Sequence, residues 1–334
     1  MKILITGGAG FIGVNTASRF IKKGWDVFVI DNLSRKGSEF NLEYLKELGK
    51  FKFLKVDIRE TEKLFDIFKK YGPFDAVIHL AAQVAVTTSV VDPFTDFEIN
   101  AFGSLNLLEA TRRFSPDASF IFSSTNKVYG SLEKYDYEML KNGVPEEMPL
   151  DFHSPYGCSK GCADQYVRDY SRIYGLKTVV FRQSCIYGPR QFGIEDQGWV
   201  AWFIIAGMLG KKIIIYGDGK QIRDLLFVDD LIDLYEITIK NIENVRGEIF
   251  NIGGGKQNKL SLLEMIGLLE ERLNKKIELE FDKERPGDQK IFVADISKVE
   301  RKLGWKPKVC ISDGVNVFFD WAKKNKNIIL EFYK

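Results

Sequence analysis

Histidine and cysteine are scarce in this sequence, with two and four residues among 334. The cysteines stand at positions 158, 162, 185 and 310 without the paired spacing of zinc ligands, so we expect reduced thiols and no metal site. An excess of charge of either sign is also missing, because 48 lysine and arginine residues nearly balance 46 aspartate and glutamate residues. Neither a nucleic acid nor an acidic membrane surface is therefore an expected partner.

The sequence also has no long hydrophobic run. The longest one, residues 199–210, is shorter than the roughly 18 residues that cross a bilayer, and it predicts a buried helix instead. The first residues run directly into a glycine-rich loop, which leaves no room for the apolar core of a signal peptide. We therefore expect a cytoplasmic protein, and its 45% hydrophobic and 28% charged residues are typical of a globular chain with a substantial core.

Short apolar runs alternate with amphipathic stretches in the first half of the chain. This pattern predicts an α/β fold, a doubly wound parallel sheet of the Rossmann type, with strands at 3–5, 27–30, 53–56, 76–80, 120–122 and 178–181. Residues 1–182 form the predicted Rossmann domain, and residues 183–334 form a smaller α/β substrate domain. A helix at 227–239 and a strand at 248–252 are expected to rejoin the first domain, over about residues 226–252.

A glycine-rich loop with the spacing Gly7-x-x-Gly10-x-x-Gly13 follows the first predicted strand and opens a helix with Phe11 and Ile12. Glycines in this position let backbone amides and a helix amino terminus approach a pyrophosphate, although a purely structural turn is the alternative. Asp31 ends the second predicted strand, where a carboxylate can accept hydrogen bonds from the adenosine ribose. This favours NAD, while Arg35 and Lys36 keep NADP open.

Tyr156 and Lys160 stand four residues apart in a segment that begins with Ser154 and Pro155, a good helix cap and a good first helical residue. The two side chains should lie on one face of a helix. An ammonium ion beside a phenol lowers the pKa of the phenol, which suits a general base. The alternative is an exposed helical pair that meets by chance.

These features, together with His79-Leu80-Ala81-Ala82 and Val128-Tyr129-Gly130, resemble the extended short-chain dehydrogenase/reductase superfamily, in particular its nucleotide-sugar epimerases and dehydratases. The resemblance covers essentially the whole chain and implies tightly bound NAD and a catalytic triad of Thr125, Tyr156 and Lys160. In that scheme Tyr156 removes a proton from a sugar hydroxyl, Thr125 hydrogen-bonds the same oxygen, and Lys160 holds the nicotinamide ribose. The resemblance also implies cofactor contacts from Asn32, Asp57, Ile58, Leu80, Ala81, Ala82 and Asn100.

Two of these assignments depend on neighbouring residues. Asp57 matches the position that contacts adenine, but a turn residue at the end of a strand is an equal alternative. After Thr125, sugar 4,6-dehydratases carry an Asp-Glu pair that supplies acid and base, whereas this chain has Asn126 and Lys127. Dehydration is therefore disfavoured, and epimerisation needs no such pair; a surface turn is the alternative for the two residues.

Several longer segments, 124–130, 154–161, 183–193 and 195–202, are similar to the CDP-paratose 2-epimerase branch, also called CDP-tyvelose 2-epimerases. That similarity implies inversion of carbon 2 of a CDP-3,6-dideoxyhexose through a 2-keto intermediate, for surface polysaccharide (O-antigen) synthesis. The implied contacts to this CDP-sugar come from Thr125, Asn126, Cys185, Gln191, Arg223 and Arg285.

The substrate residues have structural alternatives. Cys185 stands where the family often has asparagine, and a small buried residue is its alternative role. Arg223 and Arg285 can each bind a phosphate through two hydrogen bonds, or can pair with Asp224 or Asp288.

Two other functions stay open. A UDP-hexose 4-epimerase would use the same triad with the sugar turned differently, and a non-catalytic NAD-sensing protein would use the cofactor loop alone. The resemblance also implies a homodimer or homotetramer, paired through helices near residues 100–113 and 156–172.

Overall fold

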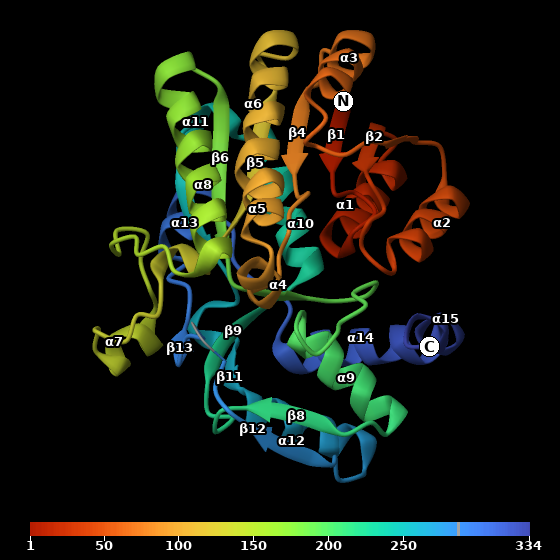
Figure 1. The fold of residues 1–334 in the computed structure, drawn as a ribbon, viewed down its shortest axis with the longest axis vertical. Helices are drawn as coiled ribbons and strands as arrows, with labels where there is room; N and C mark the ends of the chain where they lie inside the picture. The colour runs from red at the N-terminus through yellow and green to blue at the C-terminus, as the bar shows by residue number, and fades with distance from the viewer. Residues whose placement is uncertain (286–287) are drawn as a thin grey trace. The chain divides into compact units, whose positions relative to one another are not determined.

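The computed structural model describes residues 1–285 and 288–334, and the chain forms two compact units (Figure 1). The first unit consists of three segments, Met1–Val128, Ser154–Arg182 and Ile232–Phe250. The second unit also consists of three, Tyr129–His153, Gln183–Leu231 and Asn251–Lys334.

A sheet of seven strands forms the centre of the first unit: β1 (Lys2–Thr6), β2 (Asp26–Asp31), β3 (Lys52–Lys55), β4 (Ala76–His79), β5 (Ser119–Thr125), β6 (Lys177–Gln183) and β10 (Ile249–Ile252). Their order is β10-β6-β5-β4-β1-β2-β3, and the neighbouring strands from β3 to β5 run parallel (Figure 1). The strand order reverses at β1, which has β2 on one side and β4 on the other. The predicted doubly wound α/β fold is therefore confirmed.

The helices of the first unit are α1 (Phe11–Lys22), α2 (Ser38–Leu48), α3 (Thr61–Tyr71), α4 (Val86–Val91), α5 (Pro93–Phe97), α6 (Gly103–Phe114), α8 (Ser154–Tyr174), α10 (Val228–Lys240, which begins in the second unit) and α11 (Ile242–Val245). Two short turns complete it, the π-helical η1 (Glu98–Phe102) and the 3-10 turn η2 (Asn126–Tyr129).

Both faces of the sheet are covered by helices, which is why its strands are apolar runs rather than alternating ones. On one face α3, α6 and α8 pack on Leu4, Val77 and Phe120 in one buried apolar cluster. On the other, Phe181 of β6 stacks on Tyr235 of α10 with ring centroids 5.9 Å apart.

The chain returns to the first unit through α10 and β10. The strand β10 lies beside β6, and the amide of Val180 donates to the carbonyl of Glu248 at 3.1 Å. Residues 129–153 differ from the expected boundary, because they belong to the second unit. There the amide of Val144 donates to the carbonyl of Val293 at 2.7 Å, and the side chain of Gln289 donates to the carbonyl of Gly130.

The second unit contains β7 (Cys185–Tyr187), β8 (Ile213–Tyr216), β9 (Ile222–Phe227), β11 (Lys259–Ser261), β12 (Leu279–Asp282) and β13 (Ile291–Phe292). Strand β9 pairs with β7, β11 and β13, and β8 pairs with β12. Its helices are α7 (Tyr137–Asn142), α9 (Trp199–Leu209), α12 (Leu262–Leu273), α13 (Ser297–Leu303), α14 (Ile311–Lys324) and α15 (Lys326–Phe332), with the 3-10 turn η3 (Gly255–Gln257). The buried helix predicted at 199–210 is confirmed as α9.

Among the helices of the described residues, none combines the length and the apolar composition of a membrane-spanning segment. Within residues 1–285 and 288–334, no group of three or more His, Cys, Asp and Glu side chains is arranged to hold a metal ion. All four cysteines are free thiols.

Candidate active site

The glycine-rich loop joins β1 to α1 through a turn that demands glycine at two positions. Gly7 has a φ of +65°, and a Cβ on Gly13 would lie 2.2 Å from the carbonyl oxygen of Gly7. In the described structure no side chain caps the start of α1, and no carboxylate lies in its first turn. The amides of Phe11, Ile12 and Gly13, which follow Gly10, are therefore placed to bind an anion.

Asp31 ends β2 beside this loop. Its carboxylate accepts hydrogen bonds from the amides of Ala9 at 3.0 Å and Leu33 at 2.8 Å. Burial raises the pKa of this carboxyl, while the amide hydrogen bonds oppose the rise. Arg35 and Lys36, the residues that keep NADP open, are exposed. The loop thus has a carboxylate acceptor next to it.

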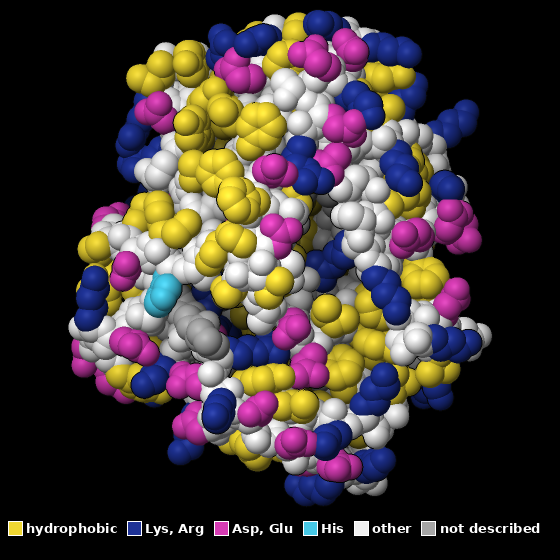
Figure 2. Space-filling model, viewed as in Figure 1, with side chains coloured by type: hydrophobic (Ala, Val, Ile, Leu, Met, Phe, Trp, Pro, Cys, Tyr) yellow, Lys and Arg dark blue, Asp and Glu magenta, His cyan; other side chains and the backbone are white. Residues whose placement is uncertain are grey.

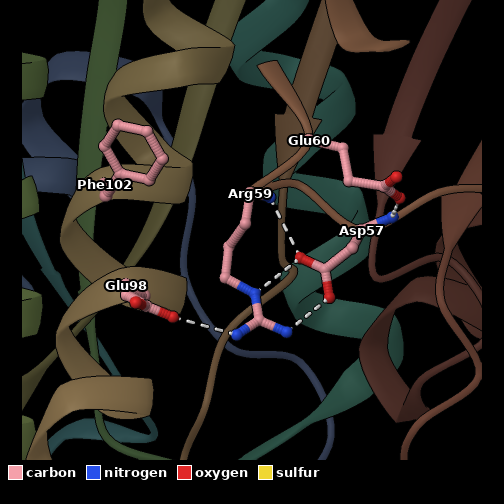
Figure 3. A pocket seen from close by; sticks show the side chains of 5 residues that line it. All are labelled: Asp57, Arg59, Glu60, Glu98 and Phe102. Atoms are coloured by element: carbon pink, nitrogen blue, oxygen red, sulfur yellow. Dashed lines mark hydrogen bonds and ion pairs between the residues drawn. The ribbon is translucent and has the colours of Figure 1, made fainter. Parts of the chain in front are cut away.

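Asp57 lines a pocket of about 500 Å³ together with Arg59, Glu60, Glu98 and Phe102 (Figure 3). The Arg59 guanidinium lies between two carboxylates, because it donates to both oxygens of Asp57 at 3.0 Å and to Glu98 at 3.1 Å. Burial raises the pKa of Asp57, but the hydrogen bonds and the charge of Arg59 lower it to about 2. Asp57 therefore stabilises the turn at the end of β3 through Arg59, and it also lines a pocket.

Two neighbours of Asp57 belong to the expected cofactor contacts. Asn32 donates to Asp57 at 2.8 Å and so ties the end of β2 to the end of β3. Ile58 is buried in the apolar cluster of the first unit. Of these two neighbours, Asn32 has the polar side chain and Ile58 the apolar one.

His79 ends β4 as a neutral link between neighbouring elements. Its ring is hydrogen-bonded to Thr6 of β1 at 2.8 Å and to Ser104 of α6 at 2.9 Å. Burial lowers its pKa to about 3, and the charge of Lys160 adds to this effect. An imidazole in this state positions the strand ends and is not a general acid or base at neutral pH.

The backbone after β4 passes close to the glycine-rich loop. The amides of Leu80 and Ala81 each donate to the Thr6 hydroxyl at 3.3 Å, and Ala82 follows them. A Cβ on Gly7 would lie 2.7 Å from the amide nitrogen of Ala81. The structure therefore brings these residues and the loop to one edge of the sheet.

Asn100 lies in the π-helical turn η1, a local geometry that is frequent at functional sites. Its side-chain amide exchanges two hydrogen bonds with the backbone of Gln83, both of 3.0 Å, and it donates to the Ser159 hydroxyl at 3.0 Å. Asn100 thus connects the loop after β4 with α8, the helix that carries Tyr156 and Lys160.

Helix α8 places Tyr156 and Lys160 one turn apart on its buried side, with 8% and 4% of their surface exposed. Ser154 starts the helix with a φ of +66°, and its hydroxyl accepts a hydrogen bond from the amide of Gly157 at 3.3 Å. The side chain of Thr125, at the end of β5, is hydrogen-bonded to Tyr156. The structure thus brings Thr125 and Tyr156 together. Lys160 lies one turn further along α8, where its Nζ donates to the carbonyl of Ser123.

The pKa values of this pair differ from the expected ones. Burial raises the pKa of Tyr156 to about 12, although the hydrogen bond with Thr125 lowers it. Burial also lowers the pKa of Lys160 to about 7. The charge of Lys160 is not among the causes of the Tyr156 shift, so the lowering of the Tyr156 pKa by Lys160 stays a prediction.

Asn126 and Lys127 follow Thr125 in the turn η2. Asn126 is buried, and its side-chain oxygen accepts a hydrogen bond from the Thr125 hydroxyl at 3.3 Å. The amide of Lys127 donates to the same hydroxyl at 3.2 Å. The two residues therefore orient Thr125, and for Asn126 the surface-turn alternative is wrong.

Four of the predicted substrate residues lie in the second unit. The indole of Trp199 donates to the Cys185 sulfur at 3.4 Å. The side chain of Gln191 donates to the carbonyl of Ile186 at 3.3 Å, and its buried oxygen has no hydrogen-bond partner in the described part of the chain. Gln191 therefore keeps an acceptor for a ligand.

Arg223 and Arg285 both form ion pairs with carboxylates. Arg223 is paired with Asp288 at 2.7 Å, as the structural alternative expects. Arg285 is paired with Asp196 at 2.9 Å and lies 3.9 Å from the ring centroid of Tyr216. A pyrophosphate bound by these guanidinium groups would compete with the two carboxylates.

Comparisons with known proteins agree with this geometry. The family model described as GDP-mannose 4,6 dehydratase matches residues 4–318. The chain belongs to this family. CDP-paratose 2-epimerase of Salmonella typhi is 50% identical over 338 residues, which cover 96% of this chain and 99% of the relative.

Two solved structures of epimerases have the same fold. The UDP-glucose 4-epimerase of Thermotoga maritima, solved with UDP-glucose, is 34% identical with a TM-score of 0.85, over 98% of this chain and 100% of that one. The UDP-glucuronic acid 4-epimerase of Bacillus cereus, solved with UDP-glucuronic acid and NAD, is 32% identical with a TM-score of 0.85, over 97% and 99%. Membership of the extended short-chain dehydrogenase/reductases is thus confirmed.

Three buried charged residues in or near α8 are not among the site residues predicted from the sequence. Asp96, Asp164 and Arg182 are each at most 2% exposed. Arg182 donates to the two oxygens of Asp164 at 2.9 and 3.0 Å. Asp164 stands four residues after Lys160, and this helical spacing could have indicated it. No comparable pattern marks Asp96.

Proposed function

We propose that this chain is an NAD-dependent epimerase that converts CDP-paratose to CDP-tyvelose by inverting carbon 2 of the sugar. The observation that carries the proposal is the 50% identity with the Salmonella typhi CDP-paratose 2-epimerase over nearly the full length of both chains. The contact between Thr125 and Tyr156 supports it, because this pair offers a hydroxyl and a base to one sugar oxygen.

The residues of the first unit fit NAD. The glycine-rich loop is shaped so that a Cβ at Gly7 or Gly13 would fill the space next to the backbone, and it leads into an uncapped helix amino terminus that suits a pyrophosphate. Asp31 would accept hydrogen bonds from the adenosine ribose, and Asp57 and Asn32 would lie at the adenine end. The chemistry that NAD supplies when bound is reversible hydride transfer, through which carbon 2 becomes a ketone and then an inverted alcohol.

The chain's own residues move the proton. Tyr156 would take the proton of the C2 hydroxyl as the ketone forms and return it to the same oxygen after the sugar has presented its other face. Thr125 would hold that oxygen through a hydrogen bond, oriented by Asn126. Lys160, in its charged form, would favour the phenolate and donate to the nicotinamide ribose.

The same residues argue against the other reactions. Asn126 and Lys127 offer no carboxylate for the elimination of water, which disfavours a 4,6-dehydratase. A UDP-hexose 4-epimerase remains the second candidate, because a Thermotoga maritima enzyme of that name shares the fold at 34% identity. A non-catalytic NAD sensor would not need the buried contact between Thr125 and Tyr156.

The substrate's CDP group would be bound by the second unit. Arg223 and Arg285 would each release a carboxylate partner to bind the pyrophosphate through two hydrogen bonds. Gln191 would offer its unpartnered oxygen to a sugar or base donor, and Cys185 would line the pocket.

Self-association belongs to the same proposal. Large apolar side chains are exposed on α4, α5, η1 and α8, and Figure 2 shows hydrophobic side chains gathered over this region; they are Val90, Val91, Phe94, Phe97, Phe102, Tyr166, Ile173 and Tyr174. A patch of this kind on a monomer favours a protein partner, and we propose a second copy of the chain, as a homodimer or within a homotetramer. We also place the enzyme in the cytoplasm, in synthesis of a surface polysaccharide such as O-antigen.

The direct test is incubation of the purified protein with CDP-paratose and, separately, with UDP-glucose, while proton NMR follows the configurations at C2 and C4. We expect inversion at C2 of the CDP-sugar alone. Inversion at C4 of the UDP-sugar would establish the second candidate instead, and no reaction with either would remove both substrate assignments.

Replacement of the ribose acceptor should weaken cofactor binding. We expect Asp31→Ala to raise the dissociation constant of NAD by about 10- to 100-fold, because a hydrogen bond to a charged group is worth about 1.5–3 kcal/mol. Calorimetric titration with NAD measures the change. Asp26→Ala, at the exposed far end of β2, is the matched control. Unchanged NAD binding in Asp31→Ala would refute the role of Asp31.

A further inference from the structure

Asp96 is a buried carboxylate that the proposed proton transfer does not use. It lies in α5 with 1% of its surface exposed. Its two oxygens accept hydrogen bonds from the Ser159 hydroxyl and, at 3.2 Å, from the Asn100 amide. Both donors are neutral. A carboxylate removed from water with only neutral donors is costly, so a cation is expected near it.

Lys160 follows Ser159 directly and is 4% exposed. Its Nζ donates to the Ser123 carbonyl at 2.6 Å and lies 4.3 Å from the ring centroid of Phe122. A carbonyl dipole and an aromatic face both favour an ammonium ion, but neither carries a full negative charge. Lys160 therefore needs a carboxylate to remain charged when buried.

Two buried carboxylates stand near Lys160, and one of them is already matched. Asp164, one turn further along α8, forms two hydrogen bonds with the guanidinium of Arg182 and accepts another from Ser124. This pair is neutral as a whole, since Arg182 is permanently charged. The buried cluster of Asp96, Lys160, Asp164 and Arg182 is therefore electroneutral when Asp96 and Lys160 are both charged or both uncharged. Within a neutral cluster, Lys160 is an ammonium ion only when Asp96 is ionised.

We propose that Asp96 is a positioning residue of the candidate active site, whose carboxylate is the counter-charge that keeps Lys160 an ammonium ion. It acts through Lys160 and touches neither proposed ligand, whereas Asn100 and Ser159 fix its place. This role rests on the proposed function only for its effect on turnover. The electrostatic coupling itself belongs to the folded protein.

The charged and titratable groups that face Lys160 determine whether its pKa rises or falls when the Asp96 charge is removed. Burial lowers the pKa of Lys160, and the charges of Asp164 (α8) and, to a smaller extent, Asp96 (α5) raise it against this effect. The charge of Asp96 also raises the pKa of Tyr156. His79 (β4) is neutral and Arg182 (β6) is paired. Removal of the Asp96 charge therefore lowers both pKa values. Lys160 then loses its proton at a lower pH, and the phenolate loses its supporting cation.

The first experiment titrates Lys160 by NMR in protein labelled at the lysine side-chain carbons. The NMR signal of a lysine that titrates near neutrality is distinct from those of exposed lysines, which titrate at higher pH. The loss of this signal in Lys160→Met assigns it to Lys160. We expect Asp96→Asn to lower the pKa of Lys160 by about one unit or more. Ser159→Ala, which removes a hydrogen bond and keeps the carboxylate, should change this pKa far less. Equal shifts in the two variants, or none in Asp96→Asn, would overturn the proposal.

The reciprocal variant covers the case in which Asp96→Asn fails to fold. In Lys160→Met, the Asp96 carboxylate loses its counter-charge, and its own pKa should rise as measured by carbon NMR of the side chain. An unchanged Asp96 pKa in a folded Lys160→Met protein would show that the two groups are not coupled.

The effect on turnover is read from the pH profile of kcat/KM for CDP-paratose. We expect the alkaline limb of Asp96→Asn to move to lower pH by the shift measured for Lys160. A profile that moves only on the acid limb would mean that Asp96 acts on Tyr156 alone, which contradicts the proposal. If the parent protein does not turn over CDP-paratose, the proposed function fails while both NMR titrations still decide the coupling.

Discussion

Tyr156→Phe is expected to lower kcat by about 10²- to 10⁴-fold while NAD stays bound, because the change removes only the phenolic oxygen that would carry the proton. The ring remains in its buried place beside Thr125 on the sheet side of α8. The measurement is turnover of CDP-paratose by NMR together with the amount of NAD that remains with the protein after gel filtration.

Tyr170→Phe is the matched control for this prediction. Tyr170 is a buried tyrosine of the same helix, and its hydroxyl donates to Glu109 at 2.9 Å, away from Thr125. It should retain turnover within a few-fold of the parent. If Tyr156→Phe did the same, Tyr156 could not be the base, and the proton transfer would have to be assigned to another group.

Arg182→Met is expected to reduce the free energy of unfolding by about 3–5 kcal/mol, the usual loss when one partner of a buried ion pair is removed. Asp164 is fully buried and Arg182 is 2% exposed, so the carboxylate would be left without a compensating charge. Urea denaturation followed by circular dichroism measures the loss, through a lower midpoint.

An exposed ion pair of the same unit calibrates this result. Glu243→Gln removes a partner of Lys177 from a pair 2.8 Å long whose carboxylate is 60% exposed, and it should cost at most about 1 kcal/mol. The double variant Asp164→Asn with Arg182→Met should recover part of the loss. A loss of less than about 1 kcal/mol in Arg182→Met alone would show that water or another cation compensates Asp164.

Much of the first unit follows from short-range patterns. The strands from β1 to β6 contain apolar runs, of which β3 has the shortest, Phe53-Leu54, and the parallel order of the sheet is consistent with the rules for βαβ connections. The placement of residues 129–153 could not be predicted in this way. It depends on the pairing of Val144 with Val293, two residues that are far apart in the sequence.

Some residues of the candidate site could likewise be predicted from local sequence patterns, and others could not. Gly7, Gly13 and the pair Tyr156 and Lys160 are visible because backbone geometry and helical spacing demand those residues at those positions. The pKa shifts of Tyr156 and Lys160 could not be predicted from the sequence, because their main cause is burial, which depends on the whole fold. The role of Asp96 was also hidden, since its partners come from α8 and from a π-helical turn that no local pattern predicts.

The late return of the chain to its first unit has a consequence for synthesis on the ribosome. Strand β6 ends at Gln183, but β10, its neighbour at the sheet's edge, begins only at Ile249. At about 5–20 residues per second, roughly 65 residues of delay leave the edge of β6 open for about 3–13 s while segments of the second unit emerge. During that interval the nascent chain presents unpaired backbone groups to other strands, so a chaperone that shields this edge would raise the yield of folded enzyme.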